Sequence, residues 1–109
     1  MSEKYQNISV ALKAISDPKR LKIVDMLSCG EMCACNILTA FNITQPTLSH
    51  DMKVLSNAGV VNTRREGQNI FYSLNQARLD EIEAFLHVTF HPDDDCICHT
   101  VDTKKKETL

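Results

Sequence analysis

Four of the five cysteines in this 109-residue chain form two Cys-x-Cys pairs, and these pairs are the residues best suited to chemistry. The first pair is Cys33 and Cys35; the second is Cys96 and Cys98, followed directly by a histidine. The fifth, Cys29, stands alone before the first pair. An odd cysteine count with no export signal argues against a disulfide framework. In a reducing cytosol, such pairs favour a soft metal ion or a redox function.

The spacing of the first pair places a condition on its local structure. Residues at i and i+2 of a regular helix are separated by about 200° of rotation, so Cys33 and Cys35 cannot both face one ion there. They can converge only where a helix begins between them or unwinds. A ligand held by both thiolates should therefore distort the start of that helix.

The pattern of apolar residues predicts five helices and one hairpin. The helices are expected at about residues 4–15, 18–28, 33–41, 45–57 and 76–90, with Leu21, Val24 and Leu27 facing inward from the second. Asp17 and Thr44 are the expected N-caps of the second and fourth helices. The β-rich runs 60–65 and 69–74 flank Glu66-Gly67-Gln68 and predict a β-hairpin.

This order of elements predicts a mainly α (α+β) fold, a winged helix-turn-helix in which the hairpin is the wing. We expect residues 1–92 to form one DNA-binding and dimerisation domain, and residues 93–109 to form a flexible cysteine-containing tail. No apolar run is long enough to cross a membrane and the first residues lack a signal-peptide core, so a cytoplasmic protein is expected.

The net charge of −2 does not exclude a nucleic-acid partner, because the charge is unevenly distributed. Residues 1–74 carry eight Lys and Arg against six Asp and Glu, whereas residues 75–109 carry four against eight. The exposed side of the fourth helix bears hydrogen-bonding side chains in place of the usual Glu and Lys mixture. Residues assigned to the reading of bases are Gln45, Thr47, Ser49 and His50, and those assigned mainly to phosphates are Lys53, Arg64 and Arg65.

Four motifs in register resemble the ArsR/SmtB family of metalloregulatory repressors. They lie in residues 15–23, 31–38, 44–55 and 59–72, within a match that covers about residues 5–90. The resemblance implies a homodimer, with the first and last helices at its interface, that represses an operon by binding an inverted-repeat operator. It also implies release of the operator when a metal or metalloid ion binds.

The stretch Glu-Met-Cys-Ala-Cys-Asn at residues 31–36 is similar to the Glu-Leu-Cys-Val-Cys-Asp box of the family's arsenic- and antimony-responsive branch. The resemblance therefore implies that Cys33 and Cys35 bind As(III) or Sb(III) as inducer. In the best-known form of that box a third cysteine follows, and here its place is taken by Leu38. A third sulfur could come from Cys29, or from Cys96 or Cys98.

Other interpretations remain open from the sequence. Four sulfurs, including both tail cysteines, would suit Cd(II), Pb(II) or Zn(II), and an oxidant or persulfide could act on the same thiols. His87 and His91 have a ligand-capable spacing, but the family's zinc pattern around them is absent, so we expect ordinary surface residues. A soft-metal carrier or a small thiol enzyme is a distant alternative, because no acid–base pair accompanies a nucleophile. We therefore expect a protein that is not an enzyme.

Overall fold

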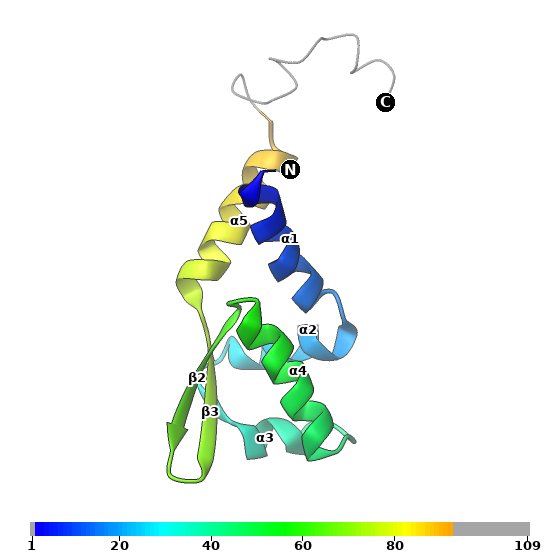
Figure 1. Cartoon of the computed structure of the whole chain (residues 1–109), viewed down its shortest axis with the longest axis vertical. Coiled ribbons are helices and arrows are strands. Elements are labelled where there is room, and N and C mark those ends of the chain that lie inside the picture. Colours follow the sequence, from blue (N-terminus) through cyan, green and yellow to red (C-terminus); the bar gives the residue numbers. More distant parts are fainter. Residues whose placement is uncertain (1, 93–109) are drawn as a thin grey trace. The chain divides into compact units, whose positions relative to one another are not determined.

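The computed structural model describes residues 2–92, and these divide into two compact units after Leu79. The helix α5 begins at the end of the first unit and makes up most of the described part of the second. In chain order the elements are α1 (Glu3–Ile15), α2 (Pro18–Leu27), β1 (Met32–Cys33), α3 (Ala34–Thr39), α4 (Gln45–Asn57), β2 (Val61–Glu66), β3 (Asn69–Leu74) and α5 (Gln76–Phe90) (Figure 1).

The N-caps predicted from the sequence are confirmed. The Asp17 carboxylate accepts hydrogen bonds from the backbone N–H groups of Lys19 and Arg20, and Pro18 occupies the first turn of α2, where no N–H partner is lost. The Thr44 hydroxyl accepts from the backbone N–H of Thr47 at the start of α4. These caps fix where α2 and α4 begin, so the polar face of α4 begins at Gln45, directly after the Thr44 cap.

The β2–β3 hairpin is the predicted wing, and its two-residue turn contains Gly67 at φ +61°, a backbone conformation that favours glycine. The sheet also contains a strand that the sequence did not predict. The short strand β1 pairs with the other edge of β3, with Met32 opposite Tyr72 and Cys33 opposite Phe71. As a result, the first cysteine of the pair belongs to the sheet that forms the wing.

The core of the first unit lies between α1, α2, α3 and α4. Ile23 is fully buried and Leu27 nearly so, whereas Leu21 is 52% exposed, so the prediction that Leu21 faces inward was wrong. Leu21 lies about 200° around the helix from Ile23, and the buried side of α2 is set by Ile23 and Leu27 at i and i+4. The other deeply buried apolar residues of the described part include Ile37, Leu48, Met52, Leu55 and Val60.

A buried carboxylate joins α4 to α2. Asp51 is 3% exposed, and its two oxygens lie 2.9 Å from Lys19 Nζ and 3.2 Å from Arg20 Nη1. Arg20 also donates from Nε to the Ala14 carbonyl at the end of α1. Three helices are therefore held together by one charged cluster on the side of α4 opposite its exposed polar face. In the described residues, no helix is both long and apolar enough to cross a membrane.

Candidate thiolate site and nucleic-acid interface

The chain changes from strand to helix between the two cysteines of the first pair. Cys33 ends β1 with extended dihedral angles (φ −71°, ψ 144°) and is the N-cap of α3, so α3 begins one residue later than predicted. Cys35 lies in the first turn of α3. The two Sγ atoms are 2.6 Å apart, and the backbone N–H of Cys35 donates to the Cys33 Sγ at 3.4 Å. The condition that both sulfurs converge on one point is therefore met.

The two thiols of this pair differ in acidity. The hydrogen bond from the Cys35 thiol, together with the backbone N–H of Cys35, lowers the pKa of Cys33. The same thiol–thiol hydrogen bond, followed by desolvation, raises the pKa of Cys35. Of the two thiols, Cys33 is therefore the one that ionises at the lower pH, and its thiolate is the form that binds a thiophilic ion.

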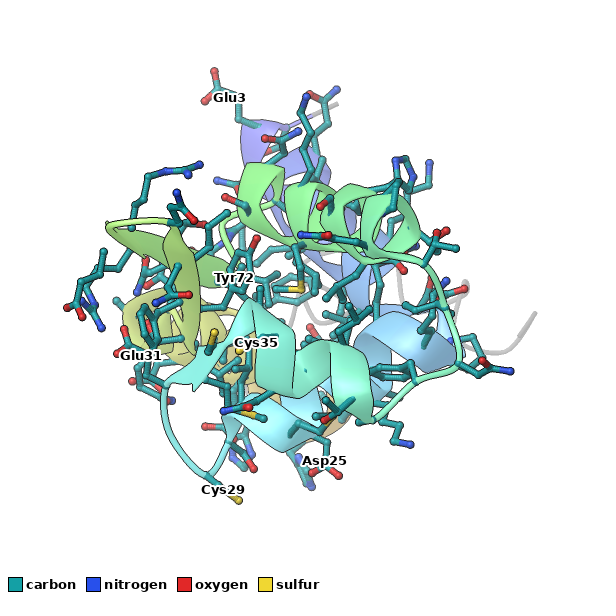
Figure 2. All side chains as sticks on the ribbon, turned by 90° about the horizontal axis from the view of Figure 1, so that it is seen from below. Glu3, Asp25, Cys29, Glu31, Cys35 and Tyr72 are labelled. Carbon is teal, nitrogen blue, oxygen red and sulfur yellow. The ribbon has the colours of Figure 1, made fainter. Side chains whose placement is uncertain are left out.

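The other cysteines do not join this pair within the described residues. Cys29 is exposed, and Figure 2 shows its sulfur at the outer edge of the loop after α2, pointing away from Cys35. Cys96 and Cys98 lie outside the described residues. Across residues 2–92, no group of three or more Cys, His, Asp or Glu side chains is placed to hold a metal ion.

His87 of α5 and His91, the residue directly after this helix, stack on each other, with ring centroids 4.6 Å apart and His91 Nδ1 3.1 Å from the His87 carbonyl oxygen. Both are exposed, and no third ligand accompanies them in the described part of the chain. This arrangement is the one expected of ordinary surface residues.

The exposed face of α4 presents most of the side chains that the sequence assigned to bases. Gln45, Ser49 and Lys53 follow at intervals of four residues and are exposed, as is His50. Thr47 is half-buried, and its hydroxyl lies 3.0 Å from the Thr44 hydroxyl. Thr47 thus contributes to the cap of α4, a role that the sequence analysis missed.

The structure separates the two wing arginines that the sequence treated alike. Arg64 donates from Nε and Nη2 to the Glu31 carboxylate at 3.0 and 2.8 Å, and from Nη1 to Glu66 at 2.8 Å. Its guanidinium also lies 4.5 Å from the centroid of the Phe71 ring. Arg65 is exposed and, as the next residue along β2, projects from the opposite face of the hairpin.

These ion pairs change the titration of both partners. The hydrogen bond from Arg64 lowers the pKa of Glu31, and the hydrogen bonds to Glu31 and Glu66 raise the pKa of Arg64. Both arginines belong to the body of β2, and the turn of the hairpin is formed by Gly67 and Gln68. Arg64 and Arg65 therefore lie two to three residues before the turn and not at the tip of the wing.

A pocket of about 250 Å³ connects the thiols to the face of α4. It is lined by Cys33 and Cys35, by Gln45 and Ser49 from the first turns of α4, and by Tyr72 of β3. In Figure 2, Cys35 and Tyr72 are labelled beside each other at this position. Sequence reasoning missed this pocket because its walls come from segments that are far apart in the chain.

Two helices joined by a tight turn, with an exposed polar second helix and a β-hairpin beside it, define a winged helix-turn-helix DNA-binding protein. Residues 17–63 match the model of the bacterial regulatory proteins of the arsR family. The chain is 45% identical over 97 residues to the arsenical resistance operon repressor of Staphylococcus aureus, covering 89% of this chain and 93% of that one. It is 47% identical over 94 residues to the repressor of the same description from Staphylococcus xylosus, covering 86% and 90%.

The chain therefore belongs to the ArsR family and is a transcriptional regulator, not an enzyme. A more distant relative is a CadC homolog from S. aureus, described as a cadmium resistance transcriptional regulatory protein. It is 34% identical over 84 residues, covering 74% of this chain and 69% of the relative.

Solved structures agree with this assignment. One is a possible transcriptional regulator for arsenical resistance, with a TM-score of 0.68 and 28% identity, covering 77% of this chain and 86% of that one. Another is a homodimeric winged helix-turn-helix domain from Mycobacterium bovis, described as a possible ArsR-family regulator. Its TM-score is 0.65 at 25% identity, covering 84% and 90% of the two chains. The predicted fold and the resemblance to the arsenic-responsive branch are thus confirmed.

Proposed function

We propose that this protein represses a resistance operon for arsenic or antimony, and that As(III) or Sb(III) releases it from its operator by binding Cys33 and Cys35. The observation that carries the proposal is the convergence of two sulfurs, 2.6 Å apart, at the start of the first helix of the helix-turn-helix. Trivalent arsenic and antimony are thiophilic and bind sulfur in a pyramidal arrangement. The arsenical resistance repressors to which the chain is similar support the same inducer.

The operator is double-stranded DNA with an inverted repeat, read by α4 in the major groove. The exposed amide of Gln45 is suited to bidentate pairing with adenine, and Ser49 and His50 offer further donors and acceptors. Thr47 contributes to the N-cap of α4 and, in this arrangement, lies next to the DNA backbone. Lys53 and Arg65 are exposed cations that can contact phosphates. Arg64 is already paired with Glu31 and Glu66.

The connection between the thiols and the DNA-reading elements gives the switch its mechanism. Cys33 is paired with β3 of the wing through Phe71, and Cys35 lies in the first turn of α3, the helix that precedes α4. An ion that draws both sulfurs to itself therefore acts on the wing and on the helix-turn-helix together. To shift the ratio of released to DNA-binding conformation from 1:99 to 99:1, the inducer must bind the released conformation more favourably by about 5.5 kcal/mol. Multidentate thiolate binding reaches about 10–16 kcal/mol for structural zinc, so enough free energy is available.

A homodimer matches the two half-sites of an inverted repeat. On α1, Tyr5 and Val10 are 44% and 51% exposed; on α5, Val88 and Phe90 are 62% and 68% exposed. Large apolar residues exposed on a helix are typical of a surface that a partner covers. The homodimeric relative from M. bovis supports this arrangement. We further propose that residues 1–92 are the DNA-binding and dimerisation domain, with residues 93–109 as a tail, acting in the cytoplasm where the operator lies.

A second inducer class is supported by the relative described as a cadmium resistance regulator. Cd(II), Pb(II) or Zn(II) would use Cys33 and Cys35 together with further ligands, for which Cys96 and Cys98 are the candidates. A thiol oxidant or persulfide would act on the same pair without a metal.

A panel of inducers tests the proposal. Fluorescence anisotropy of a labelled operator is measured while arsenite, antimonite, Cd(II), Pb(II), Zn(II) or peroxide is added in turn. We expect stoichiometric release by arsenite and antimonite, at one ion per protomer and without turnover. Release by Cd(II) or Pb(II) at lower concentration than arsenite, or release by peroxide alone, would assign the sensor to the corresponding alternative.

A further inference from the structure

The thiol pair supplies two of the three donors that trivalent arsenic takes. Leu38 stands one helical turn after Cys35, at the position where a third sulfur would complete the box, and it lines the pocket beside both cysteines. Cys29 points away from the pair, and the described residues contain no other Cys, His, Asp or Glu side chain placed to complete a three-ligand site. Among residues 2–92, therefore, no side chain fills the third coordination position of an arsenic held by Cys33 and Cys35.

The pocket next to the sulfurs has the size and lining of a site for a small molecule. Its volume of about 250 Å³ is many times the roughly 30 Å³ that one water molecule occupies in the liquid, and falls just short of drug-sized sites. Its lining combines apolar side chains with amides and a hydroxyl, the usual composition of a ligand pocket. The apolar residues include Leu48, Ile70 and Tyr72, and the polar residues are Gln45, Ser49 and Asn69 together with Gln68 of the turn.

We propose that the third ligand of the bound arsenic is the sulfur of a small cellular monothiol, of the cysteine or cysteinyl-peptide class, whose body occupies this pocket. This inference rests on the proposed function, because it extends the binding of As(III) by Cys33 and Cys35. The apolar wall accommodates the carbon chain of the thiol, and the amides of Gln45 and Asn69 can hydrogen-bond its carboxylate or amide groups.

The assembly is a ligand exchange without electron transfer. Arsenous acid carries three As–O bonds, which break as three As–S bonds form, to Cys33, Cys35 and the monothiol. Each departing hydroxide takes the proton of one thiol and leaves as water, so three water molecules are released and arsenic stays trivalent.

Occupancy of the pocket would act directly on DNA reading. Gln45 and Ser49 line the pocket and also belong to the exposed face of α4 assigned to bases. A monothiol held there engages or covers these two side chains at the moment when arsenic constrains Cys33 and Cys35. The inducer that the repressor senses is thus the metalloid together with its cellular thiol.

The test is an arsenite titration of the full chain, reduced with a phosphine so that no other thiol is present, at several concentrations of added cysteine or glutathione. Binding is followed by the sulfur-to-arsenic charge-transfer absorbance, and the composition of the complex by native mass spectrometry. We expect one arsenic and one monothiol per protomer, with an apparent arsenite affinity that rises in proportion to the monothiol concentration until the site is saturated.

The variant Leu38→Cys provides the decisive comparison, because it places a third sulfur of the chain in the pocket wall. It should bind arsenite with an affinity independent of added monothiol and without monothiol in the complex. The matched control Leu38→Ala, which removes the same side chain without adding sulfur, should keep the monothiol dependence. If Leu38→Cys still takes up one monothiol per arsenic, the pocket does not hold the third ligand and the inference is wrong.

Two further outcomes separate this inference from the proposed function. If the wild-type affinity does not depend on monothiol, the inference is overturned. Loss of arsenite binding in Cys29→Ser or in Cys96→Ser/Cys98→Ser would then identify the chain's own third sulfur, and the proposed function would stand. If Cys33→Ser/Cys35→Ser binds arsenite as tightly as the wild type, the proposed function itself fails.

Discussion

The guanidinium of Arg64 holds the Glu31 carboxylate by two hydrogen bonds of 3.0 and 2.8 Å, although the two residues are 33 positions apart in the chain. Glu31 lies two residues before Cys33, and Arg64 lies on β2 of the wing. Arg64 and Cys33 both face Phe71 in the sheet, from β2 and from β1 respectively. The thiolate site and the wing are therefore linked in two ways, by the pairing of β1 with β3 in the sheet and by the Glu31–Arg64 ion pair.

The first prediction concerns this ion pair as a link between inducer and operator. The relevant quantity is the operator affinity without arsenite divided by the operator affinity with arsenite. In Glu31→Gln this ratio should fall about two- to thirtyfold, which corresponds to a loss of about 0.5–2 kcal/mol of coupling free energy. The reason is that movement of the segment before Cys33 is no longer passed to Arg64. Anisotropy titrations with and without arsenite measure this ratio.

The matched control is Glu66→Gln, which removes the other ion pair of Arg64 and leaves the segment before Cys33 untouched. It should keep the wild-type ratio. Equal ratios in the two variants would show that the Glu31–Arg64 pair does not carry the coupling.

The second prediction distinguishes the two wing arginines at the DNA. Arg65→Gln should weaken binding similarly across operator sequences and make the slope of log affinity against log salt shallower by about 0.9 for each phosphate that the arginine neutralises. Arg64→Gln should change the slope less, because Arg64 is already neutralised by Glu31 and Glu66. The check is operator binding at several salt concentrations. A slope that stays at the wild-type value in Arg65→Gln would remove Arg65 from the interface.

The third prediction follows from the lowered pKa of Cys33. Because the Cys35 thiol donates to it, Cys33 becomes a thiolate at a lower pH than an ordinary cysteine, and its alkylation by iodoacetamide should begin at that lower pH. In Cys35→Ala that donor is removed, and the pH midpoint of Cys33 alkylation should move upward. Cys35→Ser, which keeps an O–H donor, should give an intermediate midpoint. Mass-spectrometric alkylation rates test this order, and a midpoint unchanged in Cys35→Ala would contradict it.

The fourth prediction concerns the charged cluster that fixes α4. Asp51→Ala should lower the free energy of unfolding by about 1–3 kcal/mol, because it leaves the partly buried cations Lys19 and Arg20 without their shared carboxylate. The exposed Asp25 on α2 provides the control, and Asp25→Ala should change that free energy by less than about 0.5 kcal/mol. Urea denaturation measures both. Similar values for the two variants would show that the cluster does not stabilise the fold.

Local signals made most of the fold predictable. Asp17 before a proline, Thr44 before the fourth helix, and a glycine between two β-rich runs each act within a few residues, and the structure confirms what they predict. The side of α2 that is buried depends on neighbouring helices, and there the inward assignment of Leu21 was wrong while Ile23 was overlooked.

The candidate site was predictable in its residue types but not in its connections. The spacing of Cys33 and Cys35 indicates that a helix must begin between them, which is where α3 begins. The strand β1 is only two residues long and exists through pairing with β3, which lies much later in the chain, so no local pattern reveals it. The same holds for the Glu31–Arg64 pair and for the pocket, whose walls are assembled from α3, α4 and β3.

The central claim is that the sulfurs of Cys33 and Cys35 are the trigger of release. It is tested most directly by adding arsenite to the operator complex of Cys33→Ser/Cys35→Ser, beside the wild type and the control Cys29→Ser, with anisotropy as the readout. The double variant should bind the operator as the wild type does and stay bound at arsenite concentrations that release both the wild type and the control. Release of the double variant at the wild-type concentration would contradict the central claim.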